Sequence, residues 1–221
     1  MQKIFLFTFI VFAQWGLAQK DSTRFSLEFS WNGGYGYRRT TATSDFNWMK
    51  QNFDNAEIGK FTQGFGIGIS KDISKRIDLL SGINLQKLGH NTDTLDNQNL
   101  ESLNYTLKYV QVPVSVRYNF ETERKLVPFV QLGLQYGYLI GVSQEYKLRN
   151  ANRTFVDRNF NGENRSAFST LAAVGFLVPL YHQSSFIFSL NGQYNLSPLS
   201  NEGVSKYYYS TGVMLAWKQQ F

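Results

Sequence analysis

Residues 24–38 read RFSLEFSWNGGYGYR, and the hydrophobic period of this stretch decides the fold. Nearly every second position carries a large apolar or aromatic side chain, and the positions between are small or polar. Such alternation is typical of a β-strand with two different faces. The same period returns in seven further segments, which are residues 61–70, 77–88, 105–119, 128–141, 166–178, 186–196 and 207–221. The sequence therefore predicts an all-β fold with eight antiparallel strands.

The composition decides which medium meets the apolar face. The chain has 221 residues, of which 17% are charged, against about 25% in soluble domains. The eight segments hold 105 residues and only eight charges, and their second face is made of Gly, Ser, Asn, Thr and Gln rather than a charged coat. We therefore predict an eight-stranded antiparallel up-and-down transmembrane β-barrel with lipid-facing apolar rows and a narrow lumen. The alternative, a soluble lipocalin-type carrier, would turn the apolar rows inward.

The connections between the segments alternate in length, as in membrane barrels. Residues 39–60, 89–104, 142–165 and 197–206 form long connections, whereas 71–76, 120–127 and 179–185 form short ones. Short turns belong in the periplasm and long loops outside the cell, so both termini are expected in the periplasm. Tyrosines such as Tyr35, Tyr105 and Tyr209 then fall at the outer ends of strands, where we expect an aromatic girdle.

The first 18 residues resemble an export signal. Lys3 precedes the apolar run at residues 4–13, and Gly16 and Ala18 supply the small residues of a cleavage site after Ala18. Ten apolar residues in a helix rise about 15 Å, half of a hydrocarbon core of roughly 30 Å. We therefore expect a signal peptide at residues 1–18, a single barrel domain at residues 19–221, and a location in the cell outer membrane. The chain has no cysteine, which excludes disulfides and thiolate chemistry.

Residues 109–120, YVQVPVSVRYNF, resemble the fourth strand of the small PorT-like outer-membrane β-barrel family of gram-negative bacteria, and residues 127–133, VPFVQLG, resemble its fifth. The resemblance implies an outer-membrane barrel and, from the family's namesake, a role in protein secretion. It also implies that the terminal Phe221 is read by the outer-membrane assembly machinery. Pro113 lacks a backbone donor, so we expect a β-bulge at that position.

Four charged residues lie on the small face toward the periplasmic end, and these are Glu28, Asp78, Arg117 and Lys218. One interpretation is a gated or conducting core, hence a narrow pore. The favoured interpretation is a structural ion-pair plug, because eight strands leave a lumen only wide enough for side chains. Of the eight charged residues in these segments, only Lys87 and Lys108 lie on the apolar face. Both are near one rim of the barrel, where a lysine side chain can lie along the wall and place its ammonium group in water.

His90 is the candidate for an enzymatic alternative. It lies near Asp93, Asp96, Glu101 and Ser102 in sequence, which permits a Ser/His/carboxylate site in a membrane-embedded lipid-modifying hydrolase. A solvated loop histidine is the favoured interpretation, because spacing within a loop does not fix geometry. We therefore expect a non-enzymatic protein.

The long connection at residues 142–165 carries the remaining candidates. Residues 157–162 match the first half of a calcium loop, but Phe168 stands where the closing glutamate belongs, so we expect no metal site and no cofactor. A surplus of basic residues predicts a binding surface for lipopolysaccharide, phospholipid, or a secretion-system or envelope protein. These residues are Lys147, Arg149, Arg153, Arg158 and Arg165. Nucleic acid is not an expected partner, because no basic stripe with interleaved aromatics is present.

Overall fold

The computed structural model describes residues 24–42, 57–93, 100–122, 126–148, 154–157, 165–181, 183–198 and 204–221. Nine strands lie in these ranges. They are β1 (Phe25–Ala42), β2 (Glu57–Asp72), β3 (Ile77–Asp93), β4 (Leu100–Asn119), β5 (Val127–Leu148), β6 (Thr154–Asp157), β7 (Ser166–Pro179), β8 (Ser184–Asn195) and β9 (Val204–Gln220). In this part of the chain no helix is long and apolar enough to cross a membrane. Residues 1–18, the expected signal peptide, lie outside the described residues.

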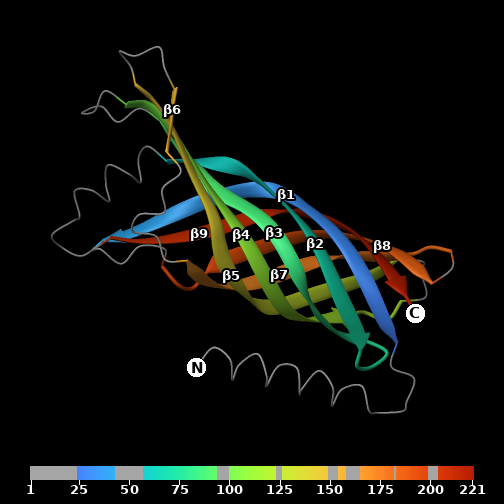
Figure 1. The fold of residues 1–221 in the computed structure, drawn as a ribbon. Coiled ribbons are helices and arrows are strands. Elements are labelled where there is room, and N and C mark those ends of the chain that lie inside the picture. The colour runs from blue at the N-terminus through green and yellow to red at the C-terminus, as the bar shows by residue number, and fades with distance from the viewer. Residues whose placement is uncertain are drawn as a thin grey trace.

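Eight of the strands close into a ring by antiparallel neighbours (Figure 1). Each strand of the ring pairs with the next along the chain, with β5 pairing directly with β7, and β1 pairs with β9 to close the ring. The short β6 stands outside the ring and pairs only with the end of β5, from Gln144 to Lys147. The predicted eight-stranded up-and-down barrel is therefore confirmed, with one additional hairpin strand that the sequence had not indicated.

The two faces of the barrel wall differ as the alternation predicts. Large apolar side chains such as Phe65, Ile67 and Leu132 are 55% to 67% exposed on the outside. The residues at the alternate positions of the strands, including Ser70 and Ser115, are buried in the lumen. This arrangement is the reverse of the one that a lipocalin-type carrier requires, so that alternative is wrong.

Glycines let neighbouring strands come close on the lumen side. Gly34 and Gly212 are paired between β1 and β9, and a Cβ at Gly34 would lie 2.1 Å from the carbonyl oxygen of Thr211. No side chain can occupy that position without moving the backbone of β9. The small residues on the lumen face of the strands therefore allow the barrel to have a small diameter.

The expected bulge at Pro113 is wrong. Pro113 stays in register opposite Gln135 on β5, and the β3–β4 register is the same on both sides of it. The Ser81 hydroxyl donates to the Pro113 carbonyl oxygen at 3.0 Å, so a side chain ties the two strands together there. The β4–β5 pairing shifts its register instead between Leu100 and Ser102 and between Lys108 and Tyr109.

The wall is taller on one side than on the other. The pairing of β7 with β5 begins at Ser166 opposite Tyr138, and β5 continues for ten further residues to Leu148. At about 3.3 Å per residue this adds about 30 Å of strand. The extension, with β4 beside it and β6 at its edge, stands away from the ring at the end that carries the long connections (Figure 1). We call this the long-loop end, and the opposite end, with both ends of the barrel chain, the short-turn end.

Candidate functional site in the barrel lumen

The short-turn half of the lumen is closed by an ion pair. Arg117 on β4 is fully buried and donates to both carboxylate oxygens of Glu28 on β1, at 2.8 and 3.0 Å. Its guanidinium also donates to the Gln131 side-chain oxygen at 3.2 Å and lies 4.9 Å from the centre of the Phe129 ring. Gln131 in turn donates to Ser115 at 2.9 Å. This bidentate geometry supplies partners for a charge that has been removed from water.

A second ion pair lies nearer the short-turn rim. The Lys218 ammonium on β9 is 3.1 Å from the carboxylate of Asp78 on β3 and 3.6 Å from that of Asp72. Asn119 also donates to Asp78 at 3.2 Å. The structure thus places Glu28, Asp78, Arg117 and Lys218 together in the short-turn half of the lumen, joined in two pairs. We call this network the ionic plug.

Outside the lumen, the short-turn rim carries one exposed ion pair. Arg76, in the turn between β2 and β3, is paired with Glu121 in the next short turn. The hydrogen bond with Glu121 raises the pKa of Arg76 above its usual value. Exposed pairs of this kind contribute little to stability, so the ionic plug is the more important network at this end.

A polar cavity lies above the ionic plug. Glu28 and Arg117 form its floor, and amide, hydroxyl and glycine positions from the strands of the ring form its walls. Its volume is about 100 Å³. Such a space holds a few waters with polar partners. Its wall includes Asn32, Asn84, Gln111, Gln135, Asn191 and Gln193.

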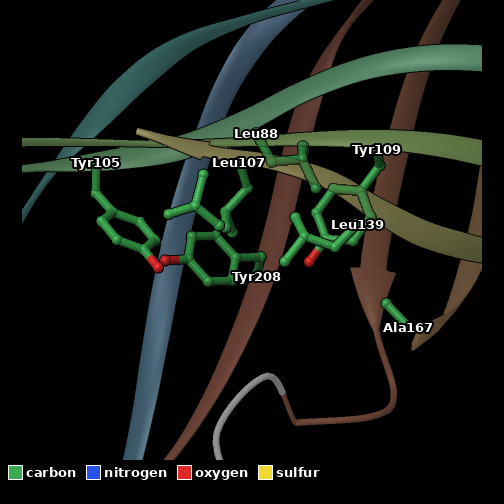
Figure 2. Close-up of a cluster of buried hydrophobic side chains, with 8 residues drawn as sticks. Leu88, Tyr105, Leu107, Tyr109, Leu139, Ala167 and Tyr208 are labelled. Atoms are coloured by element: carbon green, nitrogen blue, oxygen red, sulfur yellow. The ribbon is translucent and has the colours of Figure 1, made fainter. Parts of the chain in front are cut away.

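The long-loop half of the lumen is filled by apolar and aromatic side chains (Figure 2). Leu107 and Tyr109 from β4 lie among side chains from β3, β5, β7 and β9, and none of the cluster is more than 6% exposed. We call this cluster the aromatic plug. Its members are Leu88, Tyr105, Leu107, Tyr109, Leu139, Val142, Ala167 and Tyr208.

His90 belongs to the lining of the aromatic plug. It is 1% exposed, its Nδ1 is 3.0 Å from the Tyr208 hydroxyl, and its ring lies 5.2 Å from the Tyr105 ring. The interpretation of His90 as a solvated loop residue is therefore wrong. Ser102, the candidate nucleophile, is exposed on the strand extension, whereas Asp96 lies outside the described residues and the side chains of Asp93 and Glu101 are not described. The structure therefore does not assemble the hydrolase site.

The expectation for Tyr105 is also wrong, because this side chain fills the lumen rather than an outer girdle. A sequence signal for the aromatic plug did exist. Tyr207, Tyr208 and Tyr209 are consecutive on β9, and successive strand residues point to opposite faces, so one of the three has to face the lumen. Leu107 and Tyr109 likewise lie an even number of positions from the lumen-facing Arg117 on β4, so they are expected on the same face of the strand.

The basic loop residues are only partly described. Lys147, near the end of β5, and Arg165, just before β7, are exposed at the long-loop end. Arg149, Arg153 and Arg158 lie outside the described residues. Of the calcium-like loop, Asp157 ends β6, and residues 158–162 are also outside them. Within the described ranges, no group of three or more His, Asp or Glu residues is arranged to hold a metal ion.

Comparison with known proteins agrees with this architecture. A family model described as "outer membrane protein beta-barrel domain" matches residues 12–201. A major outer membrane protein from Thermus thermophilus is similar in fold, with a TM-score of 0.52 and 12% identity over 90% of this chain and 100% of that one. Neisserial surface protein A has a TM-score of 0.46 and 9% identity over 89% of this chain and 97% of its own. No curated protein matches the sequence.

Proposed function

Because the chain belongs to the outer membrane protein β-barrel domain family, we propose that it is a non-enzymatic integral barrel that acts through its surface, by loop binding, in a structural role, or in protein secretion or envelope assembly. The observation that supports this proposal most directly is that the lumen is blocked in both halves. The ionic plug closes the short-turn half and the aromatic plug closes the long-loop half. A narrow pore and a lumenal ligand are both disfavoured by this geometry.

The position of His90 argues against the hydrolase alternative. A catalytic histidine has to reach both its nucleophile and the substrate. Here Nδ1 is occupied by Tyr208 and the ring is enclosed by the aromatic plug. A lipid substrate on the outside of the barrel would be separated from His90 by the strand wall.

The proposed working surface is the long-loop end. The termini of the barrel and the short turns share the opposite end, which supports a periplasmic position for both termini. The extension of β4 and β5, with β6 beside it, then rises from the membrane on the outside of the cell. Lys147 and Arg165, together with the loop residues Arg149, Arg153 and Arg158, form the proposed basic binding surface there.

Export and assembly complete the proposal. The chain would reach the outer membrane after cleavage behind Ala18 and would present Phe221 to the assembly machinery. Phe221 is exposed, and its backbone nitrogen donates to the Phe25 carbonyl oxygen at 2.9 Å, so the closing strand ends with its aromatic ring outside. The likeness of residues 109–120 to a PorT-like strand is the reason for including secretion, and comparing the exported proteins of a deletion strain and a complemented strain tests that part.

Accessibility of single cysteines tests the surface role, because the chain has no cysteine of its own. Lys147→Cys on the extension should react with a membrane-impermeant maleimide on intact cells. Lys75→Cys, in the short turn between β2 and β3, should react only after the outer membrane is opened. Labelling of Lys75→Cys in intact cells would refute the proposed orientation. A steady ion current through the purified protein in planar bilayers would refute the closed lumen.

A further inference from the structure

Two lysines face each other on the outer wall of the barrel. Lys87 on β3 is directly opposite Lys108 on β4, and both side chains are exposed. Like charges directly opposite each other in a sheet are destabilising. Among the described residues, neither ammonium has a carboxylate within ion-pair distance. An arrangement that costs stability in the free protein points to an anion that relieves it.

A third lysine is held beside this pair. Lys60 lies where the β2–β3 register shifts, between Gly59 and Gln63. Its ammonium donates to the side-chain oxygens of Asn104 and Thr106 and, at 3.4 Å, to the Tyr105 carbonyl oxygen. These hydrogen bonds fix the charge against β4.

Two glycines give the lysine stems room to lie along the wall. A Cβ at Gly89 would lie 2.1 Å from the Tyr105 carbonyl oxygen and 3.2 Å from Cδ of Lys60, and one at Gly141 would lie 3.3 Å from Cδ of Lys108. A side chain at Gly89 would collide with the backbone of β4, and one at Gly141 would press against the stem of Lys108. The two glycines thus leave the space beside Lys60 and Lys108 open.

The three lysines surround a hollow of about 330 Å³ on the outer surface. The hydroxyls of Thr106 and Ser143 and the amide of Gln63 also line it, and Glu145 is the one carboxylate there. Three ammonium groups and one carboxylate leave a surplus of two positive charges. A phosphate monoester carries about −1.5 to −2 charges at neutral pH and offers three acceptor oxygens. The charge and the donors of the hollow fit that group.

The surroundings indicate a lipid rather than a free ion. Phe61 on β2 lines the hollow and is 55% exposed, and the apolar outer residues Phe65 on β2 and Leu85 on β3, which are paired with each other, lie farther along the wall. On the other side the wall continues into the polar extension of β4 and β5. The hollow therefore lies where acyl chains end and headgroups begin.

We propose that Lys87 and Lys108, with the fixed positive charge of Lys60 beside them, bind a phosphate group of lipopolysaccharide at the membrane surface. The choice of this lipid rests on the proposed function, because lipopolysaccharide occupies the leaflet on the side of the long loops only in that orientation. The site lies on the barrel wall and is separate from the basic loop residues between positions 147 and 165.

Native mass spectrometry of the folded full-length barrel, released from zwitterionic nanodiscs with added lipid, tests the proposal. Bisphosphorylated lipid A should bind the unaltered protein, and the double variant Lys87→Gln/Lys108→Gln should bind it at least tenfold more weakly. The control, Lys71→Gln/Lys75→Gln, removes two positive charges at the short-turn end and should bind as the unaltered protein does. Equal binding by the Lys87/Lys108 variant would overturn the proposal.

The lipid itself is varied to identify the source of the phosphate. Lipid A without phosphate groups should not bind, phosphatidylglycerol should bind at least tenfold more weakly, and millimolar inorganic phosphate should not displace lipid A. If any of these ligands matches bisphosphorylated lipid A, the assigned ligand is wrong.

Unfolding by urea gives an independent readout. In zwitterionic lipid, Lys87→Gln should unfold at a higher urea concentration than the unaltered protein, because the lysine opposition is removed. Added lipid A should raise the midpoint of the unaltered protein and cancel this difference, and an unchanged difference would overturn the proposal. These assays use purified protein, so failure of the unaltered protein to bind lipid A refutes this inference alone, whereas periplasmic labelling of Lys147→Cys in cells refutes the proposed function.

Discussion

The two halves of the lumen are closed by opposite kinds of chemistry. The short-turn half holds paired charges and amides around Arg117, whereas the long-loop half holds leucines and tyrosines around Leu107. The same ring of eight strands encloses both. The difference teaches that an eight-stranded wall specifies how much volume has to be filled but not what fills it.

The two plugs differ in how they respond to the loss of one side chain. A buried charge needs its partner, because removing one member leaves the other in a medium that disfavours it. An apolar cluster loses only the buried area and the packing of the residue that is removed. The ionic plug is therefore expected to tolerate single substitutions less well than the aromatic plug does.

The largest effect is expected for Arg117→Met. The substitution leaves the Glu28 carboxylate buried without its bidentate partner, and the free energy of unfolding should fall by about 3 to 5 kcal/mol. Urea unfolding in phospholipid vesicles, followed by tryptophan fluorescence, measures the change.

The double variant Glu28→Gln/Arg117→Met is the matched control. Because it removes both charges, it should regain most of the stability that the single variant loses. If both variants lose the same free energy, the pairing of charges is not what holds the short-turn half.

A smaller loss is expected in the other half for Leu107→Ala. Leu107 is fully buried in the aromatic plug, and its truncation should cost about 2 to 3 kcal/mol, in the lower part of the usual range because neighbouring rings can lean into the gap. The same unfolding assay applies. Leu132→Ala makes the same change on the exposed outer face and should cost less, so a larger loss for Leu132→Ala would contradict the assignment of faces.

The two halves also differ in how readily their sequence predicts them. Alternation alone predicts that Glu28 and Arg117 face the lumen, because each lies in a strand whose opposite face is apolar. In β4 around Leu107 this contrast is lost, since apolar side chains stand on the lumen side and Lys108 stands outside. The register shift between Lys108 and Tyr109 is set by the pairing of two strands, which no single segment reveals.

Strand bounds show the same limit. The alternating segments end at residues 88 and 141 and begin at residue 105, whereas β3 continues to Asp93, β5 to Leu148, and β4 begins at Leu100. Beyond the apolar belt the residues are largely polar on both faces, so the hydrophobic period disappears. Backbone pairing between adjacent strands maintains the extension instead.

The smallest effect distinguishes packing from hydrogen bonding within the aromatic plug. Tyr208→Phe keeps the ring but removes the hydroxyl that lies 3.0 Å from Nδ1 of His90, which leaves a buried polar atom without this partner. The free energy of unfolding should fall by about 1 kcal/mol. The adjacent Tyr209→Phe makes the same change on the outer face and should alter stability by no more than about 0.5 kcal/mol. If the two variants are equally stable, the aromatic plug is held by ring packing alone, and the contrast with the hydrogen-bonded ionic plug becomes sharper.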